Sequence, residues 1–270
     1  MRLLFGQFPL YIDGPAVILD RISSWCQKYL AADSISGSEY ILHLALAAGD
    51  EYSEHLEEGW NLVSEGRKLV YSENGKAIFA LQNEETIPET TVSIYNDCNS
   101  SIRIAMQFGT LLALRHHCIG LHGVTLLCGN RLVVLSAPSG TGKTTLARLL
   151  EEYADAIVIN GDLAMLSVSE GGVFFEPTPF CGSSGRCLNH RVRIDRVVFL
   201  EQAKKNDWQS LTGRSAMTRF MSNTFVPAWN RVLQQTIQNN VLKIVSIIPA
   251  YLFGFAPNHK AAEDFMNHLY

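Results

Sequence analysis

The sequence predicts an α/β protein with two domains: a smaller mixed α+β N-terminal domain over residues 1–100 and a larger α/β domain over residues 101–270. Three observations predict this class. Short apolar runs alternate with polar turns in the N-terminal part, helical periodicity begins at Ser101, and a glycine-containing loop at 137–144 separates an apolar strand from a helix. With 270 residues that are 47% hydrophobic, the chain can bury a substantial core.

The N-terminal domain is expected to be mainly β. Apolar runs at Tyr40–Ala48, Lys68–Tyr71 and Ala77–Leu81 have the length of strands. The last two are separated by the turn Glu73–Lys76, which contains Asn-Gly, a dipeptide that tolerates positive φ angles. These two strands are therefore predicted to form a hairpin.

A helix is predicted from Ser101 to His117, because apolar residues recur there with helical spacing. It is expected to lead into the second domain. Two strands in a hairpin follow at Val124–Cys128 and Leu132–Ser136. The second strand leads into the glycine loop, and Thr145–Tyr153 is expected to continue as a helix.

The remaining elements are predicted from shorter patterns. Ala156–Ile159 and Val197–Leu200 are almost wholly apolar, as buried strands are. Helices are expected at Arg214–Phe220, Val232–Gln238 and, as an amphipathic closing element, Ala261–Leu269.

Composition excludes several function classes. The charged fraction is 18% and the formal net charge is -4, so no nucleic-acid partner is expected. No apolar run is long enough to span a bilayer, and the N-terminus lacks the features of a signal peptide, so no membrane association is expected. The six cysteines have no C-x-x-C spacing and are expected to be reduced thiols in a cytoplasmic protein.

The run Ala137–Thr144 ends in Gly-Lys-Thr and has the strand-loop-helix context of a Walker A phosphate loop. Backbone N–H groups of such a loop, together with the positive end of the helix, bind phosphate oxygens. Lys143 is predicted to contact the β- and γ-phosphates of ATP, and the Thr144 hydroxyl to bind Mg²⁺. Ala137 replaces the usual opening glycine, which matters only where positive φ or close backbone approach is needed. The residues expected to contact the nucleotide are Pro138, Ser139, Gly140, Thr141, Gly142, Lys143, Thr144 and Thr145.

The segment His122–Val124, the phosphate loop and Asn160–Asp162 together resemble the kinase domain of HPr kinase/phosphorylase and its relatives. The relatives include kinases of lasso peptide precursors, free-serine kinases and, more distantly, ATP-dependent phosphoenolpyruvate carboxykinase. The resemblance covers about Leu121 to Leu200. It implies a P-loop domain of the HPr kinase/carboxykinase type, with ATP and Mg²⁺ as cofactors. Members of the family form hexamers, so a homo-oligomer is one expectation, although no residue pattern specifies an interface.

The resemblance also implies roles for single residues. It places His122 beside the phosphate loop, in proton transfer or metal binding, although a histidine at a strand start could equally be structural. Asp162 would bind Mg²⁺, with a turn or helix-capping aspartate as the alternative. Relatives commonly carry two successive aspartates where this chain has Gly161-Asp162, so the general base is left open among Asp162, His122 and Glu176. Arg186, in a loop that begins at Glu176, would face the acceptor, or belong to a plain surface loop.

The function expected from these residues is a kinase that transfers the γ-phosphate of ATP to a hydroxyl, with serine favoured, of a peptide, a small protein or a small molecule. The catalytic residues would be His122, Lys143, Asp162 and Arg186, and the metal ligands Thr144 and Asp162. The absent first aspartate favours the alternative, a nucleotide-binding regulatory module with impaired catalysis. A transporter-type NTPase is not expected, since the chain has no transporter signature.

Overall fold

The computed structural model describes residues 1–31, 40–47, 56–63, 68–83, 89–96, 98–227 and 230–269. The chain forms two compact units: Met1–Arg115 with Pro227–Gln235, and His116–Val226 with Thr236–Tyr270. Each unit contains helices and a mixed sheet, so the predicted α/β class is confirmed. The boundary expected at residue 100 falls inside helix α2 (Asn99–Ala113), which belongs to the first unit.

The sheet of the first unit contains seven strands among the described residues, and β3 pairs in parallel with both β2 and β7 while the other pairs are antiparallel. The predicted hairpin is confirmed, with Asn74 and Gly75 both at positive φ. Of the run predicted at 40–48, Ala48 lies outside the described residues. In spatial order the strands are β1 (Arg2–Phe5), β2 (Phe8–Asp13), β3 (Tyr40–Leu46), β7 (Glu89–Ile94), β6 (Lys76–Asn83), β5 (Lys68–Glu73) and β4 (Gly59–Val63).

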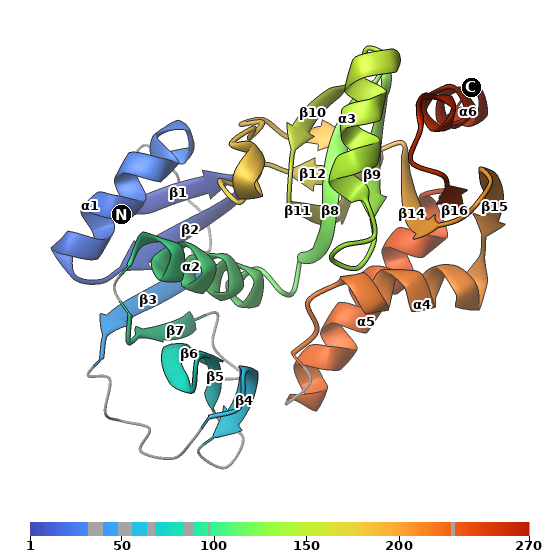
Figure 1. Cartoon of the computed structure of the whole chain (residues 1–270). Coiled ribbons are helices and arrows are strands. Elements are labelled where there is room, and N and C mark those ends of the chain that lie inside the picture. Colours follow the sequence, from blue (N-terminus) through green and yellow to red (C-terminus); the bar gives the residue numbers. More distant parts are fainter. Residues whose placement is uncertain are drawn as a thin grey trace. The chain divides into compact units, whose positions relative to one another are not determined.

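The described part of the first unit also contains two whole helices and the first residues of α5 (Arg231–Ile247). Helix α1 (Ala16–Cys26) is followed by a 3₁₀ turn at Gln27–Tyr29. Helix α2 packs against β3, β6 and β7 (Figure 1). Its apolar residues, which gave the helical pattern in the sequence, include the fully buried Ile102 and Ala105. The pattern thus predicted the helix, but not its end: the helix stops at Ala113, short of the predicted His117. Its buried face packs on the sheet of the first unit.

The sheet of the second unit contains nine strands among the described residues, and its centre is parallel: β14 pairs in parallel with β9 on one side and β16 on the other. The hairpin of β8 and β9 confirms the prediction. In spatial order the strands are β13 (Val192–Arg193), β12 (Gly172–Glu176), β11 (Leu163–Ser169), β8 (Cys118–Cys128), β9 (Arg131–Ser136), β14 (Arg196–Gln202), β16 (Ala250–Phe255) and β15 (Asp207–Leu211), with β10 (Ile157–Asn160) also paired to β8.

The central strand β14 distributes its side chains between two cores, because successive residues of a strand point to opposite faces. Val197 and Phe199 join a cluster with residues of α4 (Gly213–Asn223) and α5 (Arg231–Ile247). Val198 and Leu200 join a second cluster with residues of α3 (Lys143–Tyr153) and α6 (His259–Leu269). Both faces of this strand are therefore buried, as its apolar sequence predicts.

The expectation of six reduced cysteines is wrong. Cys181 and Cys187 form a disulfide, with their Cα atoms 5.5 Å apart. The chain turns back on itself between them, which brings two thiols together without the C-x-x-C spacing that sequence analysis looks for. The expectation of a cytoplasmic location loses the support that it drew from reduced thiols.

None of the helices in the described ranges is long and apolar enough to cross a membrane.

Candidate active site

The predicted phosphate loop, residues 137–144, follows β9 and leads directly into α3. Gly142 immediately precedes the helix with φ at 112°, and a Cβ atom there would lie 2.8 Å from the ring of Phe255. Both the left-handed backbone and the close approach require glycine at this position. Ala137 is buried and does not have positive φ, so an alanine at the opening position meets no conformational obstacle.

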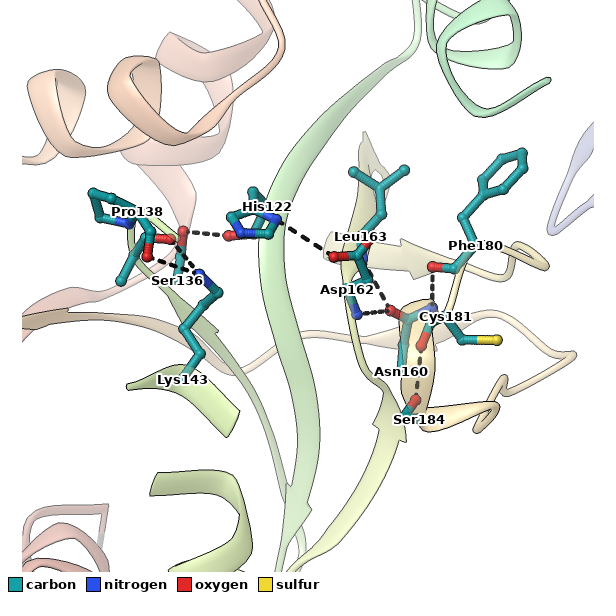
Figure 2. A network of polar contacts seen from close by, with 11 residues as sticks. His122, Ser136, Pro138, Lys143, Asn160, Asp162, Leu163, Phe180, Cys181 and Ser184 are labelled. Carbon is teal, nitrogen blue, oxygen red and sulfur yellow. Dashed lines mark hydrogen bonds and ion pairs between the residues drawn. The ribbon is translucent and has the colours of Figure 1, made fainter. Parts of the chain in front are cut away.

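Lys143 folds back over the loop that precedes it. Its ammonium donates to the carbonyl oxygens of Ala137 at 2.6 Å and Pro138 at 3.0 Å, and the residue is only 8% exposed (Figure 2). Burial lowers the pKa of Lys143, and the nearby charge of Asp162 opposes that shift. An ammonium group has three donors, so these two bonds leave a third for a phosphate oxygen.

Strand β8 changes partners at its centre, and this change builds the site. His122 pairs with Leu163 of β11, while the next residue, Gly123, pairs with Ser136 of β9. The Gly123 amide donates to the Asp162 carbonyl at 2.9 Å, and the Ser136 hydroxyl donates to the His122 carbonyl at 2.8 Å. The dipeptide at 122–123 therefore holds both the end of the phosphate-loop strand and the turn that carries the carboxylate (Figure 2).

The His122 imidazole faces the Asp162 carboxylate, with Nδ1 and Oδ1 3.7 Å apart. Their side chains are 42% and 35% exposed, so a bound molecule could reach both. Burial lowers the pKa of His122, the charge of Lys143 lowers it further, and Asp162 acts in the opposite direction. A histidine with a lowered pKa is mostly neutral near pH 7 and can accept a proton.

Asn160 fixes the turn that presents Asp162. It is fully buried at the end of β10, and its side-chain oxygen accepts hydrogen bonds from the amides of Asp162 at 3.1 Å and Leu163 at 3.2 Å. Its side-chain nitrogen donates to the Phe180 carbonyl at 3.3 Å. The sequence motif included Asn160, but its positioning role was not predicted. The available signal was a polar residue at the end of an apolar run.

Gly161 is the position at which the resemblance stated above led one to expect an additional aspartate. A Cβ atom at this position would lie 2.6 Å from Ser184 Cβ and 2.9 Å from the Cys181 carbonyl oxygen. The Ser184 hydroxyl donates to that same carbonyl at 2.7 Å, within a 3₁₀ turn at Gly182–Ser184. The segment closed by the disulfide thus occupies the space that a side chain at 161 would need.

Arg186 lies in this segment, and its side chain forms an ion pair with Glu151 of α3. Glu151 also accepts a hydrogen bond from the Val158 amide at 3.3 Å. The loop is further attached to β10 by a bridge between Asn160 and Cys187. The family resemblance predicted that Arg186 faces the acceptor, with a plain surface loop as the alternative; in the structure its guanidinium pairs with a carboxylate on α3.

Seven of the eight predicted nucleotide-binding residues line three cavities, and Lys143 is not among the lining residues of these three. The first, of about 210 Å³, contains Thr144, Arg148, Glu151, Gly161 and Arg186. Thr144, Arg148 and Glu151 share one face of α3 through helical spacing, so a sequence pattern could have identified the last two as site residues. The second cavity, of about 480 Å³, is lined by Gly140, Thr141, Gly142, Thr145, Gln202, Ala203, Lys204, Phe255 and Pro257. The third, of about 440 Å³, is lined by Pro138, Ser139, Gly140, Thr141, Leu200, Glu201, Gln202 and Arg219.

The oxygen donors at this site fit Mg²⁺ bound together with phosphates better than a metal ion held by protein ligands alone. The described ranges contain no group of three or more His, Cys, Asp or Glu residues that could hold a metal ion. Magnesium usually keeps several waters and binds through one or two protein oxygens together with substrate phosphates. The Thr144 hydroxyl, on a cavity at the helix start, and the half-exposed Asp162 carboxylate are oxygen ligands of that kind.

Glu176, one of the three candidates for the general base, does not fit that role. It is fully buried, and its Oε1 accepts hydrogen bonds from Arg191 at 2.7 Å and from Ser167 at 2.5 Å. The Arg191 guanidinium also stacks on Phe174, 3.6 Å from the ring centre. Glu176 and Arg191 therefore hold strands β11, β12 and the following segment together.

No protein-family model and no curated protein match the sequence. Among solved structures, the HPr(Ser) kinase/phosphatase from Coxiella burnetii is similar over 56% of this chain and 87% of its own, with a TM-score of 0.35 and 10% sequence identity. This is a distant structural likeness, and the function has to be argued from the site itself.

Proposed function

We propose that the protein is an ATP-dependent kinase that transfers a phosphoryl group to the hydroxyl of a serine-type acceptor, carried by a peptide, a small protein or a metabolite. One observation carries the proposal. A buried lysine on a strand-loop-helix segment, Lys143, lies close enough to His122 and Asp162 for their charges to influence one another. A cation directed at phosphate and a carboxylate that can bind Mg²⁺ are recurring groups in phosphoryl transfer, and a neutral imidazole can accept the proton of the acceptor.

The proposed roles follow from the contacts. Lys143 and the loop amides bind the phosphates. The dipole of the helix that follows adds favourable positive potential at the same place. Thr144 and Asp162 would hold Mg²⁺, which supplies charge neutralisation between the β- and γ-phosphate oxygens. The acceptor oxygen bonds to the γ-phosphorus, the bond from that phosphorus to the bridging oxygen breaks, and ADP leaves. His122 takes the proton of the acceptor hydroxyl.

His122 is favoured as the base because the Asp162 carboxylate lies beside it and can stabilise the imidazolium that forms. An isolated Asp162 would have to serve the metal and the acceptor together. With both residues present, Asp162 can bind the metal while His122 accepts the proton. His122 would then take the role of the aspartate that is absent at position 161.

A second function has one observation in its favour. The site has no room for a side chain at Gly161, so the carboxylate that the family resemblance leads one to expect is excluded by packing. A regulatory module that binds nucleotide without transferring phosphate would tolerate that exclusion.

The deciding experiment incubates the purified protein with γ-labelled ATP and Mg²⁺, separately with free serine, with HPr protein and with serine-containing peptides. Mass spectrometry then measures the gain of one phosphate on each acceptor. Lys143→Ala serves as the inactive comparison, with Lys260→Ala, an exposed lysine of α6, as the matched control. Transfer to one acceptor by the wild type and the control supports the kinase. ATP binding without transfer to any acceptor favours the regulatory module, and equal transfer by the Lys143 variant contradicts the role proposed for Lys143 and its loop.

A further inference from the structure

The end of β14 lies beside the phosphate loop. Since β14 runs parallel to β9, with Phe199 opposite Ser136, the two strands present their C-terminal ends at the same edge of the sheet. The Gln202 side chain reaches the Gly140 carbonyl at 3.5 Å. Glu201 and Gln202 line the cavity of about 440 Å³ together with the first residues of the loop.

Arg219 enters the same cavity from another element. It lies on α4, and its guanidinium donates to the Glu201 carboxylate at 3.2 Å. The two side chains are 37% and 49% exposed, so water reaches both. A partly exposed cation thus lines the same cavity as the first residues of the predicted phosphate loop.

This ion pair is a weak restraint on Arg219. Exposed pairs of this kind contribute little to stability, because solvent screens them and the side chains lose freedom. A nucleotide phosphate chain carries more negative charge than one carboxylate, and a guanidinium binds phosphate oxygens in a two-donor geometry. A phosphate that arrives in the cavity would therefore compete successfully for Arg219.

We propose that Arg219 is a phosphate-binding residue of the nucleotide site and that Glu201 holds it in position until the nucleotide binds. The inference rests on the proposed nucleotide-dependent function, and it adds a ligand from outside the loop and its helix. In the bound state Arg219 exchanges the Glu201 carboxylate for phosphate oxygens, and no covalent bond changes.

The two partners are expected to respond in opposite directions. Arg219→Gln removes a charge-assisted contact and should weaken MgATP binding by about tenfold to a hundredfold. Glu201→Gln removes the competitor and should strengthen binding by about two- to fivefold. Arg214→Gln, an exposed arginine on the same helix, is the matched control and should change little.

The test measures the MgATP dissociation constant by titration calorimetry, and the melting temperature of every variant by circular dichroism. A purely structural ion pair predicts equal melting shifts for the two single variants and no change in affinity, and that result would overturn the inference. Loss of affinity in Glu201→Gln as large as in Arg219→Gln would also overturn it. A wild type that binds no nucleotide refutes the proposed function as well, whereas normal binding by Arg219→Gln refutes the inference alone.

Discussion

Asp162 Oδ1 lies 3.7 Å from His122 Nδ1 because the backbone brings the two residues together. Their strands pair with His122 opposite Leu163, and the carbonyl of Asp162 accepts the amide proton of the residue after His122. The short distance between the two side chains is therefore set by the register of the sheet. The predictions below depend on it or on the loop that surrounds it.

The pKa of His122 should respond with opposite signs to its two charged neighbours. Asp162 raises this pKa and Lys143 lowers it. Asp162→Asn should therefore lower the pKa further, and Lys143→Met should raise it toward the ordinary value of 6.5. A proton NMR titration of the histidine ring measures both shifts. Shifts of the same sign in the two variants would show that the three groups are not coupled as described.

The rate of phosphoryl transfer should fall at acidic pH. Because the pKa of His122 is lowered from 6.5, its imidazole is neutral at pH 7. The ring becomes protonated as the pH falls through this lowered pKa. A protonated ring cannot accept the proton of the acceptor, so the rate should have an acid limb below 6.5. His122→Asn should lower the rate by about a hundredfold or more and remove this limb. His190→Asn, an exposed histidine, should leave the profile intact.

Lys143→Met should weaken nucleotide binding, because its ammonium is the buried cation proposed to contact the phosphates. An affinity loss of about a hundredfold is expected for a charge-assisted contact of this kind. The variant also loses the bonds to Ala137 and Pro138, so its melting temperature has to be measured. A folded variant that binds ATP as well as the wild type would contradict the assignment of the loop.

Restoring an aspartate at position 161 should not restore a second functional carboxylate. A side chain there meets Ser184 and the Cys181 carbonyl, so Gly161→Ala should already cost about 1–3 kcal/mol of unfolding free energy. Gly161→Asp should cost at least as much and lower the rate of transfer. Chemical denaturation measures the first effect and a kinase assay the second. A more active Gly161→Asp protein would show that the loop yields easily.

Breaking the Cys181–Cys187 disulfide should loosen the segment that covers Gly161. Closing a short loop stabilises a fold by on the order of 2 kcal/mol, so the double variant Cys181→Ser and Cys187→Ser should melt at a lower temperature. The pairing of Arg186 with Glu151 should weaken as well, which limited proteolysis of the segment can detect. Cys98→Ser, at an exposed free cysteine, is the control and should behave as the wild type.

Sequence patterns predicted the central elements well because those elements have strong local signals. The β8–β9 hairpin, the loop and α3 combine long apolar runs with glycine and a lysine at fixed spacing, and all three are present. Helix α5 begins close to its predicted start but continues to Ile247, beyond the predicted end at Gln238. The polar run at 238–240 interrupts the apolar residues there, although Ile237, Val241 and Ile244 keep helical spacing in the buried core.

The remaining features depend on contacts between distant segments. The 122–163 register, the packing of residues 181–184 on Gly161 and the pair of Glu201 with Arg219 join residues that no local pattern links. Strand β16 was missed because Gly254 interrupts its apolar run after a proline. Pairing of β16 with β14 and β15 supplies the stabilisation that propensity does not predict.

Ala137 has a practical consequence for how such loops are found. Its backbone has an ordinary φ, and its side chain is buried. In this chain no steric reason requires glycine at this first position, although search patterns commonly demand it. Patterns for phosphate loops should keep glycine at the position of Gly142, where φ is 112° and an aromatic ring closes the space, and admit alanine at the opening. Chains discarded by the stricter pattern then become candidates for nucleotide binding.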